Sequence, residues 1–358
     1  MGKRKFRVCF VAPVPPPYGG IANWTSMLRK YMVAEYSDKI DYRIINTSPG
    51  KRVTEGRSTI ERVVGGGLGM LHVRKQLKKL IKKRVDCVHI TTSGSLSVVR
   101  DVLIARLLAK KGIPFVYHIH FGRIPELIQK NHYEWKLLQS VIKLSQMTIT
   151  IDKKTFDALS SRDMEKIVYI PNPICSQEMP KPKETDSKKI MFLGWVIREK
   201  GIEELLDAWQ VLSAQYPEWR LEIVGPYKEA YKQDLLKRFR CERVSFLGER
   251  PHVEAMELLN DSQIFCLPSY SEGCPYVIME ALMLGKIVVA SDVGNIPEMV
   301  NENSGIVVPS RNSKRLESAL EQVINRSGEY DTKEIAKAAY EKYEIRRIVK
   351  RYVKSWMG

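Results

Sequence analysis

Two glutamates eight residues apart have the chemistry and the spacing of a site for hydroxyl groups. Glu272 lies in a loop after a strand-like run, and Glu280 lies within the helical pattern of SEGCPYVIMEA. Pro275 between them suits the start of that helix, where its missing N–H costs little. A carboxylate on an apolar helix is expensive to bury unless it is hydrogen-bonded. We therefore expect both carboxylates to accept hydrogen bonds from vicinal hydroxyls, and the first helical turn to offer free N–H groups to an anion.

The loop Phe192–Gly201 (FLGWVIREKG) supplies two cations, Arg198 and Lys200, directly after another strand-like run. Such cations can hold the phosphates of a diphosphate and stabilise the negative charge that develops when it departs. The sequence contains no Asp-x-Asp pair, the usual acidic ligand of a divalent cation on a diphosphate. If a diphosphate binds, protein groups must therefore neutralise it. An ordinary solvated basic loop is the other interpretation of this segment.

Gly19 and Gly20 stand in PVPPPYGGIANW, where a strand-like run ends and a helical pattern begins. Two glycines allow backbone N–H groups to approach an anion closely, and a helix N-terminus adds partial positive charge. A tight strand-to-helix turn that needs glycine for a positive φ would produce the same pattern. The sequence leaves both interpretations open.

These segments need a scaffold, and the apolar periodicity predicts two parallel α/β sheets. Helical stretches such as Glu203–Ala214 and Tyr276–Leu284 alternate with short β-branched runs, which is typical of right-handed βαβ units. Sheets of this kind bind ligands beyond the carboxyl ends of their strands. The predicted strands are Phe6–Val14, Tyr42–Thr47, Asp86–Thr92, Pro114–His120, Met147–Asp152 and Ile167–Pro171 in the first sheet, and Ile190–Gly194, Arg220–Gly225, Val244–Gly248, Ile264–Pro268, Ile287–Ser291 and Gly305–Pro309 in the second.

A polar, proline-rich segment, Asn172–Lys189, separates the two series of strands. We therefore predict a first lobe over residues 1–172, a linker over 173–189 and a second lobe over 190–332. Residues 333–358 have a charged helical pattern that could cap the second lobe or return to brace the first. Two lobes also suit a chain of 358 residues.

Composition excludes several classes of protein. With 44% hydrophobic and 28% charged residues, the chain can bury apolar cores, which excludes disordered and collagen-like chains. Its six cysteines (Cys9, Cys87, Cys175, Cys241, Cys266 and Cys274) include no Cys-x-x-Cys pair, which favours reduced thiols in the cytoplasm. No run approaches the roughly 18–20 apolar residues of a membrane span, and the basic N-terminus lacks the apolar core of a signal peptide.

The net charge of +17 comes from the first lobe. Residues 1–150 contain 27 Lys and Arg against 9 Asp and Glu, whereas residues 151–358 contain 31 against 32. This asymmetry indicates an anionic partner, such as membrane headgroups, lipid phosphates, acidic glycans or nucleic acid. The segment Gly65–Arg84 has apolar residues at helical spacing and lysines on the other faces, as in helices at membrane surfaces. It could equally pack its apolar stripe, Met70, Val73, Leu77, Leu80 and Ile81, on its own sheet.

Glu272-x7-Glu280, with ASDVGNIPEMV after it and GWVIREKG and PPYGGIA before it, resembles the retaining glycosyltransferases of family 4. The resemblance covers almost the whole chain. It implies the GT-B fold, in which two Rossmann-like, doubly wound domains face each other across a cleft. It also implies a nucleotide-sugar donor held mainly by the second lobe, an acceptor held by the first, and metal-independent transfer with retention.

The resemblance also assigns roles to residues. Glu280 would bind the ribose hydroxyls, and His120, at the end of PFVYHIH, matches a histidine that lies beside the transferred sugar in the family. His118 faces the same side and ranks second for that role; a core histidine is its alternative, and a His-x-His metal site is weaker because no carboxylate or cysteine ligands lie nearby. The assigned catalytic residues are His120, Lys200 and Glu272, and the assigned donor-binding residues are Gly19, Gly20, Arg198, Lys200, Glu272, Gly273, Cys274, Pro275, Tyr276 and Glu280.

The sequence departs from the family pattern at two positions. The family usually has arginine after the glycine of the phosphate loop, whereas Gly194 is followed here by Trp195. Arg198 could replace that cation, or diphosphate binding could be weaker. A later Gly-Gly pair of the family is Gly294-Asn295 in this chain, which is a mild change.

Together with these residues, the resemblance implies a metal-independent retaining hexosyltransferase without cofactors. It would move a sugar from a nucleotide-diphosphate sugar, with a UDP-sugar favoured, to a saccharide or lipid-linked saccharide during synthesis of cell-surface polysaccharide or glycolipid. We expect a cytoplasmic protein at the anionic inner face of the plasma membrane that does not bind nucleic acid. Two alternatives stay open: a nucleotide-sugar epimerase of the same architecture, and a non-catalytic binder of nucleic acid or another anionic polymer, which the pI near 9.5 suggests.

Overall fold

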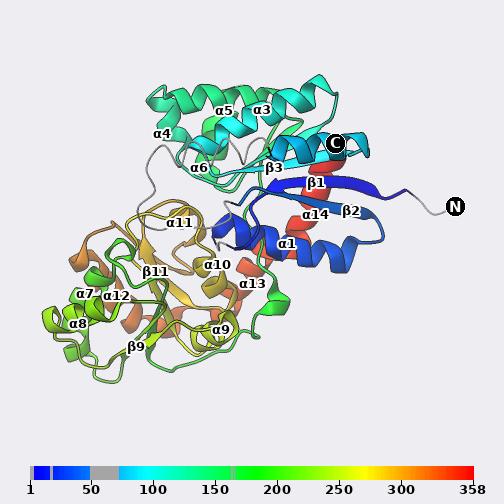
Figure 1. Ribbon diagram of the computed structural model, residues 1–358. Helices are drawn as coiled ribbons and strands as arrows, with labels where there is room; N and C mark the ends of the chain where they lie inside the picture. The colour runs from blue at the N-terminus through cyan, green and yellow to red at the C-terminus, as the bar shows by residue number, and fades with distance from the viewer. Residues whose placement is uncertain (1–3, 17–18, 49–71, 163, 165) are drawn as a thin grey trace. The chain divides into compact units, whose positions relative to one another are not determined.

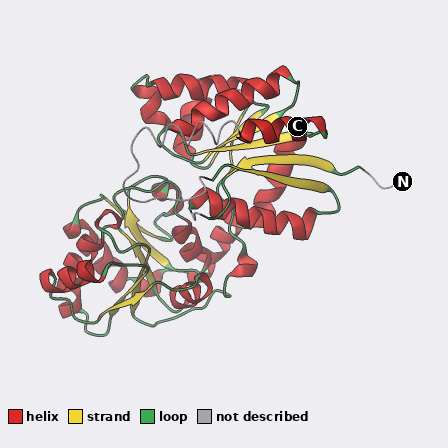
Figure 2. Cartoon of the chain, in the orientation of Figure 1, coloured by secondary structure: helices red, strands yellow, loops and turns green. Residues whose placement is uncertain are grey.

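Twelve short strands form two sheets of six, and every strand pair in the described part of the chain is parallel. The computed structural model describes residues 4–16, 19–48, 72–162, 164 and 166–358. The chain divides into two units, one made of Met1–Pro173 with Ile345–Gly358 and the other of Ile174–Glu344. Each unit has helices around one sheet (Figures 1 and 2). The predicted α/β fold with two doubly wound parallel sheets is therefore confirmed.

The first sheet has the strand order β2-β1-β3-β4-β5-β6. Its strands are β1 Phe6–Ala12, β2 Ile40–Asn46, β3 Cys87–Thr92, β4 Phe115–Ile119, β5 Met147–Thr150 and β6 Ile167–Tyr169, each of which overlaps a predicted strand. The helices of this unit are α1 Gly20–Tyr36, α3 Leu96–Lys110, α4 Ile124–Gln129, α5 Tyr133–Leu144, α6 Lys153–Ser160 and α14 Ile345–Met357, and residues 72–82 are also helical.

Side chains of the first sheet alternate between its two faces, as strand geometry requires. Val11 and Ile90 point into an apolar core shared with α3, α4 and α5. Phe10, His89 and His118 point to the opposite face, which α1 and α14 cover (Figure 1). The last helix of the chain is thus part of the first unit.

The second sheet has the strand order β12-β11-β10-β7-β8-β9. Its strands are β7 Lys189–Leu193, β8 Arg220–Val224, β9 Val244–Gly248, β10 Ile264–Leu267, β11 Ile287–Ser291 and β12 Gly305–Val308, and each overlaps a predicted strand. The helices are α7 Ile202–Gln215, α8 Glu229–Arg238, α9 His252–Asn260, α10 Tyr276–Met283, α11 Ile296–Met299, α12 Ser313–Asn325 and α13 Thr332–Tyr343, with short 3-10 turns η1 Ser176–Glu178, η2 Arg198–Lys200 and η3 Ser327–Glu329. None of the helices in the described residues of either unit is long and apolar enough to cross a membrane.

The strand order of the second sheet reverses between β7 and β10. The chain proceeds from β7 through β8 to β9 on one side, and from β10 through β11 to β12 on the other. Doubly wound sheets bind ligands outside the carboxyl ends of the strands at such a reversal. The loop after β7 contains Arg198 and Lys200, and the loop after β10 contains Glu272, so the topology brings the predicted cations and the first predicted carboxylate to one place.

The C-terminal segment 333–358 is not one continuous helix. It breaks at the buried Glu344, which has an extended backbone with φ −58° and ψ 128°. At the break, the Ile174 N–H donates to the Tyr343 carbonyl oxygen at 2.8 Å. The reason for the break is that α13 packs on α10 in the second unit, whereas α14 packs on β3 and β4 in the first.

The segment predicted as a linker, 173–189, packs on the second unit instead of forming a free connection. Ile174 is buried in the core of that unit. The side chain of Asn260 holds the following residues through both ends of its amide, because it donates to the Lys181 carbonyl at 2.8 Å and accepts from the Lys183 N–H at 3.1 Å.

Candidate functional site

Most of the predicted site in the second unit lies on three loops, which follow β7, β10 and β11, and close backbone contacts hold these loops together. Gly201 has a φ of 71°, and a Cβ at this position would overlap the Pro268 carbonyl oxygen. The Tyr270 N–H donates to the Glu199 carbonyl at 2.9 Å, which joins the loop after β10 to the loop after β7. Because glycine alone fits where backbones approach so closely, these contacts fix the relative positions of the two loops.

The loop after β11 joins the same assembly. Gly294 has a φ of 57°, and a Cβ there would overlap the Glu272 carbonyl oxygen. The Asn295 N–H donates to the Gly273 carbonyl at 2.8 Å. The first glycine of the family's Gly-Gly pair is therefore needed for packing, and asparagine is accommodated at the second position.

Lys200 and Glu272, two of the predicted catalytic residues, form an ion pair. The Lys200 Nζ lies 2.5 Å from Glu272 Oε1, and the Ser269 hydroxyl donates to the same carboxylate oxygen at 2.7 Å. Both charged side chains are mostly buried, with 27% of Lys200 and 12% of Glu272 exposed. An ammonium group has three N–H donors, so the ion pair leaves others for a ligand. Arg198 is exposed in the same loop.

Glu280 projects from α10 and is 92% buried, as the apolar helical pattern implied. Its Oε1 lies 2.8 Å from Nε2 of His252, the first residue of α9. This hydrogen bond raises the pKa of His252 above its ordinary value, against the opposing effect of burial. The expected cost of a buried carboxylate is thus offset by an imidazole that the sequence reasoning did not identify. The only sequence signal was a histidine shortly after a strand-like run.

The remaining donor-site predictions lie at two helix N-termini. Pro275 is the N-cap of α10 and Tyr276 its first residue, while Gly273 is exposed and Cys274 half-buried in the preceding loop. In the first unit, Gly19 is the N-cap of α1 and Gly20 its first residue. Both glycines are exposed, neither has a φ in the left-handed region, and a Cβ at either would meet no atom within 4 Å. A turn that demands glycine is therefore not the reason for this pair.

His120 follows β4 in the first unit, as predicted, and its ring contacts that of His118, with 3.9 Å between the ring centroids and an angle of 38° between the ring planes. Trp24 of α1 meets the His120 ring edge-on at 5.0 Å. Burial lowers the pKa of His120 to about 3, so its imidazole is neutral at physiological pH. The two histidines share one face of the sheet, which confirms the alternation predicted from their spacing.

A hydrogen-bonded chain behind His120 fixes the protons on two further histidines. The indole N–H of Trp356, which can only donate, lies 3.0 Å from Nδ1 of His89. Burial holds the pKa of His89 and of His118 well below the ordinary value, so both rings are neutral. His89 must then carry its proton on Nε2 and donate it to Nδ1 of His118 at 3.1 Å. His118 is therefore a core histidine, bonded to a side chain and not to the backbone.

Sequence reasoning missed His89, Trp24 and Trp356 as parts of this cluster. Side chains alternate between the two faces of a strand, and in the strand CVHITT this alternation places His89 on the face that α14 covers. Nothing in the sequence, however, indicates that His89 contacts His118 or Trp356. In the described residues, no three His, Cys, Asp or Glu side chains are grouped so that they could hold a metal ion. The six cysteines form no disulfide.

The basic segment of the first unit is a surface helix packed on its own sheet. Val73 and Leu77 are buried in the core, and Leu80 and Ile81 are partly buried against it. The cations of the helix and the turn after it, Arg74, Lys75, Lys78, Lys79, Lys82 and Lys83, are exposed. Residues 65–71, including Met70, lie outside the described residues. The apolar stripe is thus used for packing, while the lysines remain available to an anionic partner.

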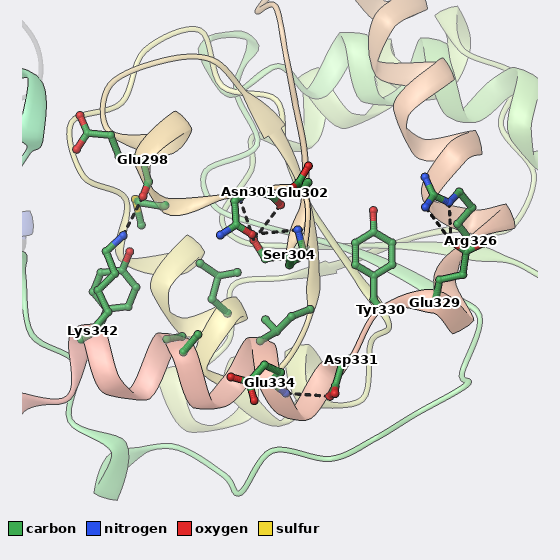
Figure 3. Close-up of a pocket in the computed structure, with 17 residues that line it drawn as sticks. Glu298, Asn301, Glu302, Ser304, Arg326, Glu329, Tyr330, Asp331, Glu334 and Lys342 are labelled. Atoms are coloured by element: carbon green, nitrogen blue, oxygen red, sulfur yellow. Dashed lines mark hydrogen bonds and ion pairs between the residues drawn. The ribbon is translucent and has the colours of Figure 1, made fainter.

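A separate cavity of about 540 Å³ in the second unit contains none of the predicted site residues (Figure 3). It lies along α13 and is lined by carboxylates such as Glu302 and Glu329 as well as by Arg326 and Tyr330. At one end the Lys342 Nζ donates to the Glu298 carbonyl at 2.8 Å and so joins α13 to α11.

The neutral histidines make the stability of the first unit sensitive to acid. An unfolded chain takes up protons on these side chains below about pH 6.5, whereas burial holds the pKa of His89 and of His118 well below that value and lowers the pKa of His120 to about 3. Stability should therefore fall as the pH drops below about 6.5. We expect His118→Asn to reduce the slope of unfolding free energy against pH by about one proton, or about 1.4 kcal/mol per pH unit.

Urea denaturation at pH 6.0, 5.0 and 4.0 measures this slope. The control is His72→Asn, because His72 is exposed and lies outside the cluster of buried histidines. Equal slopes for wild type and His118→Asn would contradict the neutral, buried state of His118.

Two family models match almost the whole chain between them. The model described as "Glycosyltransferase Family 4" matches residues 18–178, and the model described as "Glycosyl transferases group 1" matches residues 176–342. Among curated proteins, an uncharacterized glycosyltransferase of Haemophilus influenzae is 25% identical over 293 residues, which are 80% of this chain and 79% of the relative.

Solved structures with the same fold cover the chain from end to end. Anabaena HepE in complex with UDP aligns with a TM-score of 0.68 and 17% identity over 98% of this chain and 99% of that one. The lipopolysaccharide outer core galactosyltransferase WaaB aligns with a TM-score of 0.73 and 15% identity, again over 98% and 99%. With the two parallel sheets, the loops that meet at the β7–β10 reversal and the matched family models, the chain belongs to the glycosyltransferases of the GT-B fold.

Proposed function

We propose that this glycosyltransferase moves a hexose, with retention and without a metal ion, from a nucleotide-diphosphate sugar to a saccharide acceptor. The observation that carries the proposal is the Lys200–Glu272 pair at the β7–β10 reversal, where doubly wound sheets bind ligands. It combines a cation for a diphosphate with a carboxylate for sugar hydroxyls. The three loops locked together by Gly201 and Gly294 hold these groups in place before substrate arrives.

In this proposal, protein cations and backbone N–H groups neutralise the diphosphate. Lys200 donates one N–H to Glu272, and this hydrogen bond orients the ammonium group. Its other N–H donors would then bind the phosphates. The exposed Arg198 and the N-terminus of α10 add positive potential. The open space around Gly19 and Gly20 favours close approach of a phosphate to the backbone there. Residues Gly273, Cys274, Pro275 and Tyr276 complete the donor-binding loop.

The proposed reaction breaks the anomeric C–O bond to the diphosphate and forms a bond from the acceptor oxygen on the same face of the sugar. The acceptor proton passes to the departing β-phosphate oxygen, so no protein nucleophile is needed. Charge stabilisation of the leaving group is then the main catalytic effect. His120 is our candidate for the group beside the transferred sugar, where its neutral ring can share a hydrogen bond with a hydroxyl.

Two structural neighbours support the finer parts of the proposal. HepE is described in complex with UDP, with UDP and glucose, and with UDP-glucose, which favours a UDP-sugar as donor. WaaB is described as a lipopolysaccharide outer core galactosyltransferase, which favours a lipid-linked saccharide as acceptor. We therefore place the enzyme in the synthesis of cell-surface polysaccharide or glycolipid.

Lys200→Ala should lower turnover by at least about 10²-fold, because it removes a donor that stabilises charge on the leaving group. His120→Ala, in the same assay, should lower the rate more than the affinity for donor. The formation of product from a radiolabelled nucleotide sugar measures the activity of both variants. The assay contains EDTA, in which transfer by the wild type should continue. Near-normal turnover by Lys200→Ala, or loss of transfer in EDTA, would contradict the mechanism. Donor incubated without acceptor is the control, since isomerised donor would indicate an epimerase.

Glu280→Gln should weaken nucleotide binding, because the neutral amide accepts hydrogen bonds from ribose hydroxyls less strongly than a carboxylate. Calorimetry with UDP alone isolates this contact, and we expect about a tenfold loss of affinity, on the scale of one hydrogen bond to a charged group. His252→Gln, which can retain a donor to Glu280 Oε1, is the matched variant and should bind UDP more tightly than Glu280→Gln. Unchanged UDP affinity in Glu280→Gln would mean that the ribose contact is wrong.

We further propose that the exposed lysines of helix 72–82 hold the enzyme electrostatically at an anionic membrane surface. Because Val73 and Leu77 are buried in the core, the contact should depend on charge and not on insertion of apolar side chains into the membrane.

Flotation with vesicles rich in phosphatidylglycerol should recover the protein at low salt and lose it near 1 M salt. Lys75, Lys79 and Lys82 changed together to Glu should abolish flotation, whereas the control triple change at Lys237, Lys314 and Lys333 should not. Equal recovery with neutral vesicles would exclude this role.

A further inference from the structure

Trp195 is the exposed tryptophan of this protein. It leaves 63% of its surface exposed, whereas the other five tryptophans, Trp24, Trp135, Trp209, Trp219 and Trp356, are all at least 94% buried. An indole is a large apolar group that usually gains stability by burial. A single exposed apolar side chain does not by itself require an occupant, so the case for one rests on the place of Trp195 in the fold.

The backbone that carries Trp195 is fixed on both sides. The Gly194 N–H donates to the Val224 carbonyl at 2.9 Å, and the Val196 N–H donates to the Pro226 carbonyl at 3.0 Å. Val196 is buried, and Gly225 must lack a Cβ because that atom would overlap the Gly194 carbonyl oxygen. Trp195 thus projects from a preorganised loop and is not the tip of a loose one. A fixed backbone lowers the entropic cost of presenting the indole to a ligand.

This loop is also the one that carries the cations of the donor site. Trp195 lies five residues before Lys200, directly after β7 at the reversal point of the sheet. The loop is joined to the carboxylate-bearing loop by the Tyr270–Glu199 backbone hydrogen bond and by the Lys200–Glu272 ion pair. An indole at this place cannot neutralise a phosphate, as an arginine would. Its flat apolar face, however, matches the face of a pyranose ring that presents C–H groups.

We propose that Trp195 is the platform on which the transferred sugar of the donor stacks, so that the enzyme selects its donor through the sugar more than through the diphosphate. The inference rests on the proposed function, because it assumes that the β7–β10 loops hold a nucleotide sugar. It predicts a division of binding energy: the indole contributes to binding of the whole donor and contributes little to binding of the nucleoside diphosphate alone.

Because the other tryptophans are buried, acrylamide quenching of fluorescence reports on Trp195. The probes are the nucleotide sugar that most raises the melting temperature in a screen of UDP-, GDP- and ADP-sugars, and its own nucleoside diphosphate. We expect the nucleotide sugar to protect the quenchable fluorescence of the wild type and the diphosphate alone to leave it accessible. Trp195→Phe is the control, since it removes the quenchable component and keeps an aromatic platform.

Calorimetry on the same ligands gives the energetic test. Trp195→Ala should weaken the nucleotide sugar about 3- to 10-fold, the scale of one aromatic contact, and change the affinity for the diphosphate less than twofold. Trp195→Phe should recover most of the loss. Trp195→Arg should bind the diphosphate more tightly than wild type, because it adds a cation at the phosphate loop.

Several results would overturn the assignment. Equal protection by the diphosphate and the nucleotide sugar would place the indole on the nucleotide. Protection only by free saccharides or by anionic vesicles would place it on the acceptor or on the membrane. Tight binding of the nucleotide sugar without any change in quenching would leave Trp195 without a role in donor binding. If no nucleotide or nucleotide sugar binds the wild type in the screen, the proposed function itself fails, and that outcome is distinct from the others.

Discussion

The close packing of backbone on backbone at the carboxyl edge of the second sheet is the constraint on which the candidate site depends. Gly201, Gly225 and Gly294 each lie where a side chain would overlap a carbonyl oxygen of a neighbouring loop. Parallel strands end at one edge of a sheet, but their loops need not touch. Here they do, so the cation of one loop and the carboxylate of another are held in contact without help from a ligand. Preorganised charge of this kind is what charge-stabilised catalysis requires.

The same packing explains how the site tolerates charged groups that are largely buried. Lys200 and Glu272 offset each other's loss of hydration, and Ser269 adds a hydrogen bond to the carboxylate. Glu280 has a comparable arrangement with His252. In both pairs, the groups that we propose to bind substrate already have a hydrogen-bond partner within the protein. A bound donor would therefore share or replace existing hydrogen bonds, which favours specificity over simple strength of binding.

The first unit buries two histidines, His89 and His118, in one sheet. Neutral imidazoles are both donors and acceptors, so a chain from Trp356 through His89 to His118 can satisfy most of their polar atoms without charge. The C-terminal helix supplies the first donor of that chain, and this gives α14 a chemical reason to belong to the first unit. The state of the rings behind His120 is thus set by residues more than 200 positions away in the sequence.

Local pattern determined much of this protein. Twelve strands were predicted from β-branched runs because the periodicity of a strand is written in consecutive residues. The loop positions of Lys200 and Glu272 followed from the rule that parallel sheets place their loops at one edge. The resemblance to glycosyltransferases came from short motifs around these same residues. Such features need only the residues next to one another, so a single sequence contains them.

Tertiary structure alone decided the partners of these residues and the path of the chain. His252 beside Glu280, and His89 between Trp356 and His118, join segments whose spacing follows no period. The helical pattern of 333–358 gave no sign of the break at Glu344, because each half is amphipathic and either could pack on any apolar face. Likewise, the sequence does not indicate whether a tryptophan is buried. Trp195 is exposed on a loop whose backbone is held by hydrogen bonds from Gly194 and Val196 to distant carbonyls. Contacts between distant segments depend on how whole elements pack, and that information is not local to any stretch of residues.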